Sequence, residues 1–223
     1  MRSWCSTPGA SEVADSWPPA LAPLLAAAFS LWGSPVTWLE ILAFGLSLAM
    51  VIGNLRVKVW AWPLAIAASA CYGLLFAHSK LYGEASLQLF FIAISCWGWW
   101  QWSRGTDETG HVLQVRWMTP RQRLSTGAAT ALAWPMLAVL LARSTDSEVP
   151  VADALPTVAS VAGQILLGRQ YVENWLVWLG VNLFSIGLFA WKALWLTALL
   201  YALFAALSWV GWRTWQARAA AHA

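Results

Sequence analysis

Long apolar runs constrain the fold of this chain more than any other feature of its sequence. Six such runs are spread along the 223 residues, at 41–52, 61–76, 87–100, 128–141, 176–190 and 193–212. Runs that approach the roughly 20 residues needed to cross about 30 Å of hydrocarbon are typical of transmembrane helices. Only 10% of the residues are charged, against about a quarter in a soluble domain. The chain is therefore predicted to be an all-α integral membrane protein.

Seven spanning helices are predicted from these runs and the polar breaks between them. They cover residues 37–54, 60–78, 84–102, 124–142, 152–168, 174–191 and 193–213. The most polar internal stretch, 103–123, carries four arginines and lies between the third and fourth helices. Before the first span, residues 20–33 are interpreted as an interfacial helix, or as part of an extra span over 17–38. Residues 1–19 are expected to form a disordered or surface-bound tail.

The basic residues predict the orientation of the helices, because cytoplasmic loops are enriched in Lys and Arg. With the N-terminus outside and seven helices following, nine basic residues lie inside and four outside. The inner set is Arg56, Lys58, Arg104, Arg116, Arg121, Arg123, Arg169, Arg213 and Arg218, and the outer set is Arg2, Lys80, Arg143 and Lys192. This distribution predicts a cytoplasmic C-terminus.

An internal repeat relates residues 62–102 to residues 175–215 at an offset of 113. Without a gap, these pairs are identical: Trp62/Trp175, Leu75/Leu188, Phe76/Phe189, Ala77/Ala190, Leu81/Leu194, Ala85/Ala198, Leu87/Leu200, Phe91/Phe204, Ala93/Ala206, Ser95/Ser208, Gly98/Gly211, Trp99/Trp212 and Trp102/Trp215. Shared composition explains the Leu and Ala matches. It does not easily explain the serine, the Gly-Trp dipeptide and the closing tryptophan at fixed spacing.

The repeat predicts how the helices are organised. Each unit holds three predicted helices, so two units joined directly would face opposite ways, and the helix at 124–142 restores the direction. We expect a seven-helix core of two parallel three-helix repeats joined by a linker helix, the 3+1+3 arrangement of SWEET-type carriers. The predicted segments are a tail (1–35), repeat 1 (36–102), a basic loop with the linker helix (103–151), repeat 2 (152–215) and a C-terminal tail (216–223). A substrate site is expected at mid-membrane between the repeats.

Polar side chains inside the predicted spans are candidates for that site, because burying them in lipid is costly. Trp175, Trp178 and Asn182 are spaced by three, four and seven residues and so share one helix face. Indoles stack on flat rings and attract cationic ones, while a carboxamide both donates and accepts hydrogen bonds. The same face would also suit an interfacial anchor at Trp175 and a helix–helix hydrogen bond at Asn182. Further candidates, which can equally serve packing, are Gln88, Gln164, Asn174 and Tyr201.

Other chemistry has little support in the sequence. Walker A, HExxH and GxSxG motifs are absent, and no carboxylate lies deep in a predicted span. These absences argue against ATP-driven transport, an enzyme and proton coupling. Cys5, Cys71 and Cys96 have no metal spacing, and a net charge of +3 calls for no nucleic-acid partner. We expect no cofactor and no metal. The tryptophans at 97–100 and 209–212 are interpreted mainly as an aromatic belt.

Three stretches of the chain resemble the PnuC family of vitamin-precursor transporters. They are Trp38-Leu-Glu40; Lys80-Leu-Tyr-Gly-Glu-Ala-Ser-Leu-Gln88 followed by Cys96-Trp-Gly-Trp-Trp-Gln-Trp102; and Glu173-Asn-Trp-Leu-Val-Trp178-Leu-Gly-Val-Asn182 followed by Lys192-Ala-Leu-Trp-Leu-Thr-Ala-Leu-Leu-Tyr201 and Gly211-Trp-Arg-Thr-Trp215. The resemblance covers roughly residues 36–215, and Glu-Asn-Trp-x-x-Trp is its most specific part. The segment before residue 36 has no counterpart in the family pattern.

The resemblance implies a SWEET-like fold, a homotrimer and a place in the bacterial inner membrane. It implies facilitated diffusion of nicotinamide riboside, which a cytoplasmic kinase then traps for NAD biosynthesis. It also implies that Trp175, Trp178 and Asn182 contact the substrate, together with glutamines from other helices. A transporter of thiamine, or of another aromatic vitamin or nucleoside of the same superfamily, is the nearest alternative. An integral-membrane enzyme and a scaffold or receptor are the alternatives from other classes.

Overall fold

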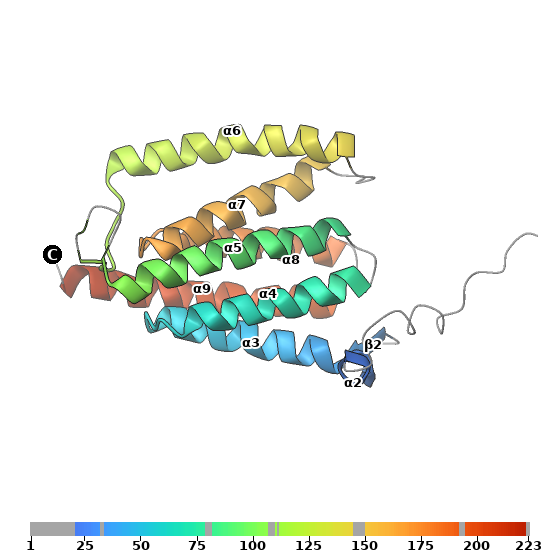
Figure 1. Cartoon of the computed structure of the whole chain (residues 1–223). Coiled ribbons are helices and arrows are strands. Elements are labelled where there is room, and N and C mark those ends of the chain that lie inside the picture. Colours follow the sequence, from blue (N-terminus) through green and yellow to red (C-terminus); the bar gives the residue numbers. More distant parts are fainter. Residues whose placement is uncertain are drawn as a thin grey trace, which may run out of the picture.

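The chain folds into a bundle of long helices (Figure 1). The computed structural model describes residues 21–31, 34–78, 82–106, 110, 112–144, 150–191 and 195–221. The long helices are α3 (Trp38–Leu55), α4 (Ala61–His78), α5 (Tyr82–Arg104), α6 (Pro120–Ser144), α7 (Pro150–Gly168), α8 (Asn174–Trp191) and α9 (Trp195–Ala221). The prediction of a helical protein is confirmed.

Each predicted span falls on one of these long helices. Helices Trp38–Leu55 and Ala61–His78 and residues Pro120–Arg143 are long and apolar enough to cross a membrane, and Ala154–Gly168 and Asn174–Leu188 are shorter apolar helices. The largest difference in bounds is at the C-terminus, where α9 continues to Ala221 instead of ending near residue 213. Its last turns are rich in alanine, the strongest helix former, so the helix outlasts the apolar run.

The segment before α3 differs from the helix expected over residues 20–33. Among the described residues of this segment, α2 (Ala22–Leu25) is the only α-helix, and β1 (Ala27–Leu31) pairs antiparallel with β2 (Ser34–Thr37). Pro35 lacks the N–H that a helix interior requires, and it lies within β2. The interfacial helix and the extra span over 17–38 are therefore wrong for the described part of this segment. The tail predicted at 1–19 lies outside the described residues.

Helix α3 begins with a capping box that fixes where the membrane-spanning part of the bundle starts. The Glu40 N–H donates to Thr37 Oγ1 (3.2 Å), and the Thr37 N–H donates to a Glu40 carboxylate oxygen (2.7 Å). These two bonds satisfy backbone donors that the first turn would otherwise leave unpaired. Glu40, the acid at the start of the first predicted span, thus has a local structural role.

The long helices pack as two groups with α6 at the edge. Helices α3, α4 and α5 pack in succession to form the first helix group, and α7, α8 and α9 form the second helix group. The groups meet where α5 contacts α7 and where α3 contacts α9. Helix α6 packs mainly against α7 and borders the bundle (Figure 1). The centre between the two groups is therefore lined by six helices.

One end of the bundle, here called the basic end, gathers most of the basic residues. Helices α3, α5, α7 and α9 finish there, and α4, α6 and α8 start there (Figure 1). These termini and their connections carry Arg56, Lys58, Arg104, Arg116, Arg121, Arg123, Arg169, Arg213 and Arg218. The set is the one that the sequence predicted to share a membrane face.

Candidate functional site

A cavity of about 300 Å³ lies between the two helix groups. Side chains from α3, α4, α5, α7, α8 and α9 line it, and α6 contributes none of the lining. Among the described residues, serine, asparagine, glutamine and tyrosine provide its polar groups, and no charged side chain lines it. A mostly apolar cavity with a few convergent polar groups is typical of a small-molecule site.

The structure brings all seven candidate residues to this one cavity. They lie on four helices: Gln88 on α5; Gln164 on α7; Asn174, Trp175, Trp178 and Asn182 on α8; and Tyr201 on α9. The shared helix face expected for Trp175, Trp178 and Asn182 is confirmed. Their contact with a substrate stays a prediction.

Trp175 and Trp178 differ in how they are held. Trp175 is 3% exposed, and its indole packs against Gly211 at a place that a Cβ would occupy. Its buried N–H finds no acceptor among the described residues. An interfacial anchor keeps its N–H wet, so that interpretation of Trp175 is wrong. Trp178 is half-buried and lies along Gly163 of α7, so its ring keeps one part toward the cavity.

Asn182 and Gln164 line the cavity and also bridge helices. Asn182 Nδ2 donates to Ser208 Oγ (3.2 Å), and that hydroxyl donates to the Phe204 carbonyl (2.8 Å). Gln164 Nε2 donates to Ser95 Oγ (3.3 Å), which joins α7 to α5 across the two groups. The helix–helix hydrogen bonds considered from the sequence are therefore present at these carboxamides, and their contact with a ligand stays a prediction. Ser95 and Ser208 are the serine pair of the 113-residue offset.

Asn174 is the first residue of α8, directly after the α7–α8 connection. It is fully buried, and its Nδ2 donates to the Tyr171 carbonyl (2.6 Å), which fixes the first turn of α8. Its Oδ1 has no hydrogen-bond partner among the described residues although it lies at the cavity. A buried amide oxygen left free is a ready acceptor for a ligand.

The seven candidates do not include every polar residue of the cavity, and Asn54 is one that the sequence missed. Asn54 is 4% exposed and lines the cavity, and its Oδ1 also lacks a partner among the residues described. At the predicted end of the first span it was indistinguishable from a loop residue. Two lining serines, Ser47 and Ser160, could have been found, because they too are 113 residues apart.

The aromatic belt accounts for only part of the chain's 19 tryptophans. Trp99, Trp100 and Trp209 are 42%, 52% and 47% exposed, as lipid-facing belt residues would be. Trp102 and Trp215, which close the two repeats, are instead buried at the basic end. The excess of tryptophan over the needs of a belt therefore lies partly inside the bundle.

Comparison with known proteins identifies the family. The profile of the family described as nicotinamide mononucleotide transporter matches residues 37–217. The chain belongs to this family. The match begins at the last residue of β2, so it covers α3 to α8 and most of α9 and leaves out the N-terminal segment.

Individual members agree with this assignment and with the resemblance to PnuC proteins. The nicotinamide riboside transporter PnuC of Escherichia coli (strain K12) is 29% identical over 168 residues, 65% of this chain and 70% of that protein. The riboflavin/roseoflavin transporter RibM of Streptomyces davaonensis is 29% identical over 194 residues, 86% of this chain and 90% of that protein. The crystal structure of the vitamin B3 transporter PnuC superposes with a TM-score of 0.68 at 24% identity, covering 83% of both chains, so the two share a fold.

Proposed function

We propose that this chain is a membrane transporter that mediates facilitated diffusion of nicotinamide riboside into the cytoplasm for NAD biosynthesis. The observation that carries the proposal is the cavity of about 300 Å³, whose described lining holds two indoles and several amides but no charge, in a member of this transporter family. Nicotinamide riboside is a cationic pyridinium with a carboxamide and a ribose, and each part has a suitable partner there.

The pyridinium ring would stack on Trp178 beside Trp175, because indole faces attract cationic rings without a buried carboxylate. The substrate carboxamide would pair with Asn182 or with the free Oδ1 atoms of Asn174 and Asn54. Ribose hydroxyls would bond to Gln88, Gln164 and Tyr201, which are polar groups on the other helices. Binding by polarisable and neutral groups also permits release, which a tight ion pair would slow.

Transport would proceed by rocking of the two helix groups around the cavity, as parallel repeats in a SWEET-like 3+1+3 arrangement. The packing of α3–α5 and α7–α9 as separate groups, with α6 outside, supports this mechanism. Because the described lining offers no carboxylate for proton or cation coupling, we propose a uniporter. Net inward flux would depend on a cytoplasmic kinase that phosphorylates and traps the substrate.

We place the protein in a bacterial inner membrane with its N-terminus outside and its C-terminus inside. The basic end supports this orientation, because basic residues favour the cytoplasmic face. The family resemblance supports a homotrimer as the working assembly. A tag at the C-terminus that is accessible to protease in inverted vesicles, and protected in spheroplasts, would verify the orientation.

A second candidate substrate is riboflavin. The relative RibM is matched over 86% of this chain, a larger share than the 65% matched by the E. coli PnuC protein. Riboflavin shares a flat ring system and a polyol with the first candidate but carries no positive charge. Thiamine remains an alternative, because it is an aromatic cation and the indole rings would attract it as well.

The test is uptake into liposomes that contain the purified protein. Labelled nicotinamide riboside, riboflavin and thiamine are each supplied outside, and their accumulation is compared with protein-free liposomes. We expect saturable uptake of nicotinamide riboside that equilibrates without an ion gradient. Saturable uptake of riboflavin or thiamine alone would reassign the substrate. No saturable uptake of any of the three would refute the proposal.

A further inference from the structure

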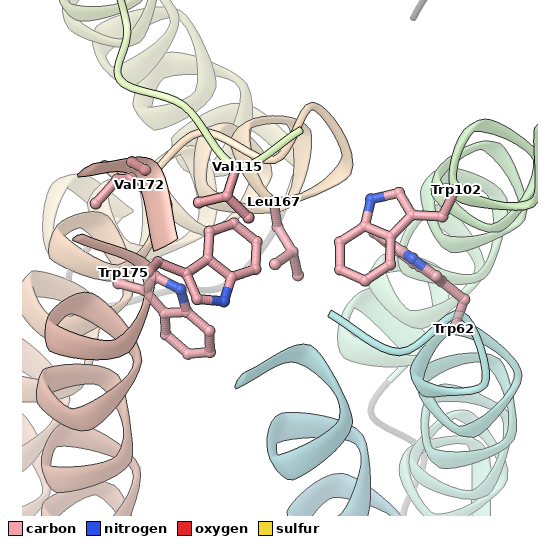
Figure 2. Close-up of a cluster of buried hydrophobic side chains, with 8 residues drawn as sticks. Trp62, Trp102, Val115, Leu167, Val172 and Trp175 are labelled. Carbon is pink, nitrogen blue, oxygen red and sulfur yellow. The ribbon is translucent and has the colours of Figure 1, made fainter. Parts of the chain in front are cut away.

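Four buried tryptophans form a layer at the basic end of the cavity. This tryptophan layer consists of Trp62, Trp102, Trp175 and Trp215, which are 1%, 5%, 3% and 0% exposed. Trp62 and Trp175 lie in the first turns of α4 and α8, and Trp102 in the last turn of α5. Figure 2 shows Trp62 and Trp102 reaching in from one side and Trp175 from the other. The layer therefore lies where the helix termini of both groups converge.

The tryptophan layer consists of two matching pairs. The ring centroids of Trp62 and Trp102 are 5.4 Å apart at an interplanar angle of 85°, and those of Trp175 and Trp215 are 5.6 Å apart, also at 85°. In each pair the first ring lies over a glycine, Gly98 or Gly211, where a Cβ would overlap it. All three positions of one pair are 113 residues from those of the other.

The two pairs meet across the boundary between the helix groups. Trp102 of the first group and Trp215 of the second have ring centroids 6.3 Å apart. Neither residue lines the cavity, whereas Trp175 belongs both to the cavity lining and to the layer. A ligand leaving the cavity toward the basic end would therefore have to pass Trp175 and then part Trp102 from Trp215.

Two indole hydrogen bonds join the two helix groups across this boundary. Trp102 Nε1 donates to the Gly168 carbonyl at the end of α7 (2.9 Å). Trp215 Nε1 donates to the Leu55 carbonyl at the end of α3 (3.3 Å) and to the Asn54 carbonyl (3.2 Å). Leu55 and Gly168 are also 113 residues apart, so each group donates one equivalent bond to the other.

The same layer contains features that oppose its closure. The indole N–H groups of Trp62 and Trp175 are buried and have no acceptor in the described part of the chain. An unpaired buried donor is costly, and opening to water would satisfy it. Val57 and Gln170 follow the accepting carbonyls with φ angles of 54° and 56°, and a left-handed conformation is strained for a β-branched residue such as Val57. The specific bonds of the layer are thus opposed by two unpaired buried donors and by local backbone strain.

We propose that the tryptophan layer is a gate that closes the cavity toward the basic end, and that the two indole–carbonyl bonds are its latches. The proposal rests on the proposed function, since a gate has a role only in a transporter that alternates between two faces. Trp102 and Trp215 would act as positioning residues that set how often the gate opens, while the ligand contacts remain with the cavity. Removing both indole–carbonyl bonds while keeping both aromatic rings should shift the protein population toward the conformation that is open at the basic end.

The test uses the variant Trp102→Phe/Trp215→Phe, which keeps an aromatic ring at both positions but removes both N–H donors. A cysteine placed at the cavity-lining position Ser160, with Cys5, Cys71 and Cys96 replaced by serine, reports access. A membrane-impermeant maleimide is applied to spheroplasts and to inverted vesicles, and a C-terminal tag identifies the face of the basic end. Trp134→Phe is the matched control, because the Trp134 indole also donates to a backbone carbonyl, that of Val151, at 2.9 Å, but outside the layer.

We expect the double variant to be labelled about thirtyfold faster from the face of the basic end, since two bonds of ordinary net strength are lost. Labelling from the opposite face should stay the same or fall, and Trp134→Phe should match the parent. An unchanged rate, or an equal rise from both faces, would overturn the proposal. If the double variant does not fold, Trp102→Phe alone is judged by the same criterion at about fivefold. Labelling needs no substrate, so a failure here is distinct from a failure of the proposed function.

Discussion

The two helix groups are alike at the basic end and different in the cavity. At the basic end, Trp62, Gly98 and Trp102 of the first group correspond to Trp175, Gly211 and Trp215 of the second. The backbone agrees as well, since equivalent positions in both groups adopt a left-handed φ of 54° or 56°. One helical turn or two further into the cavity, Ala65 and Ser69 stand where the second group has Trp178 and Asn182.

This difference separates two physical tasks. A closure between two rocking halves is served by matching surfaces, each offering a ring and a hydrogen bond to the other. A ligand without two-fold symmetry is served by unlike surfaces, because its charged ring and its polar groups need different partners. The second helix group therefore holds the aromatic and amide groups of the candidate site, while both groups share the tryptophan layer.

The largest effects should come from Gly98→Ala and Gly211→Ala. The new methyl group would overlap the ring of Trp62 or Trp175, so each variant should lose about 3 kcal/mol of stability, by equal amounts in the two groups. Thermal unfolding in detergent measures the loss. Gly45→Ala and Gly187→Ala, whose surroundings are open, serve as controls with changes below about 1 kcal/mol. A large loss of stability for only one of the two variants would show that the two helix groups are not equivalent at the basic end.

Trp178→Ala should produce the next largest effect, on substrate affinity. Loss of one stacking and cation–π surface should weaken binding of nicotinamide riboside by about 2 kcal/mol, roughly thirtyfold. Isothermal titration with folded, monodisperse protein measures the change. Trp209→Ala, which removes an indole that is 47% exposed, should leave affinity unaltered. If both variants bind like the parent, the second group has no special role in binding.

Asn182→Ser converts the position to the residue of the first group and should weaken binding by about 1 kcal/mol, roughly fivefold. Serine lacks the carboxamide group with which Asn182 lines the cavity and donates to Ser208. Leu183→Ala on the same helix, at a side chain 55% exposed, is the control. An affinity loss no larger than that of the control would leave Asn182 only its bond between α8 and α9.

The smallest effect should come from Arg123→Gln, which tests how α6 is attached to the second group. Arg123 Nε bonds to a Glu173 carboxylate oxygen at 2.8 Å, but the arginine side chain is 52% exposed. Exposed ion pairs contribute about 1 kcal/mol or less, so Tm should fall by only a few degrees. Glu173→Ala should cost more, because it also removes the acceptor of the Met118 N–H (3.1 Å). The reverse order would mean that Arg123 has another role.

The sequence predicted the parts of this structure that depend on local pattern. Apolar runs located the seven long helices, and helical spacing placed Trp175, Trp178 and Asn182 on one face. The hairpin before α3 was missed because its apolar residues alone do not distinguish a strand from a helix. Trp102 and Trp215 were predicted only as the ends of the repeat, since their burial depends on contacts between α5 or α9 and distant carbonyls. Asn54 was missed because it lies at the predicted end of the first span, where it was indistinguishable from a loop residue.

The most direct measurement of the central claim is an experimental structure of the protein with nicotinamide riboside bound. The account predicts that the pyridinium ring lies against Trp178 and Trp175. The substrate carboxamide should lie within hydrogen-bond distance of Asn182, Asn174 or Asn54. The four rings of the tryptophan layer should be either all in contact or all separated. A ligand seated outside the cavity, or held mainly by the first helix group, would contradict it.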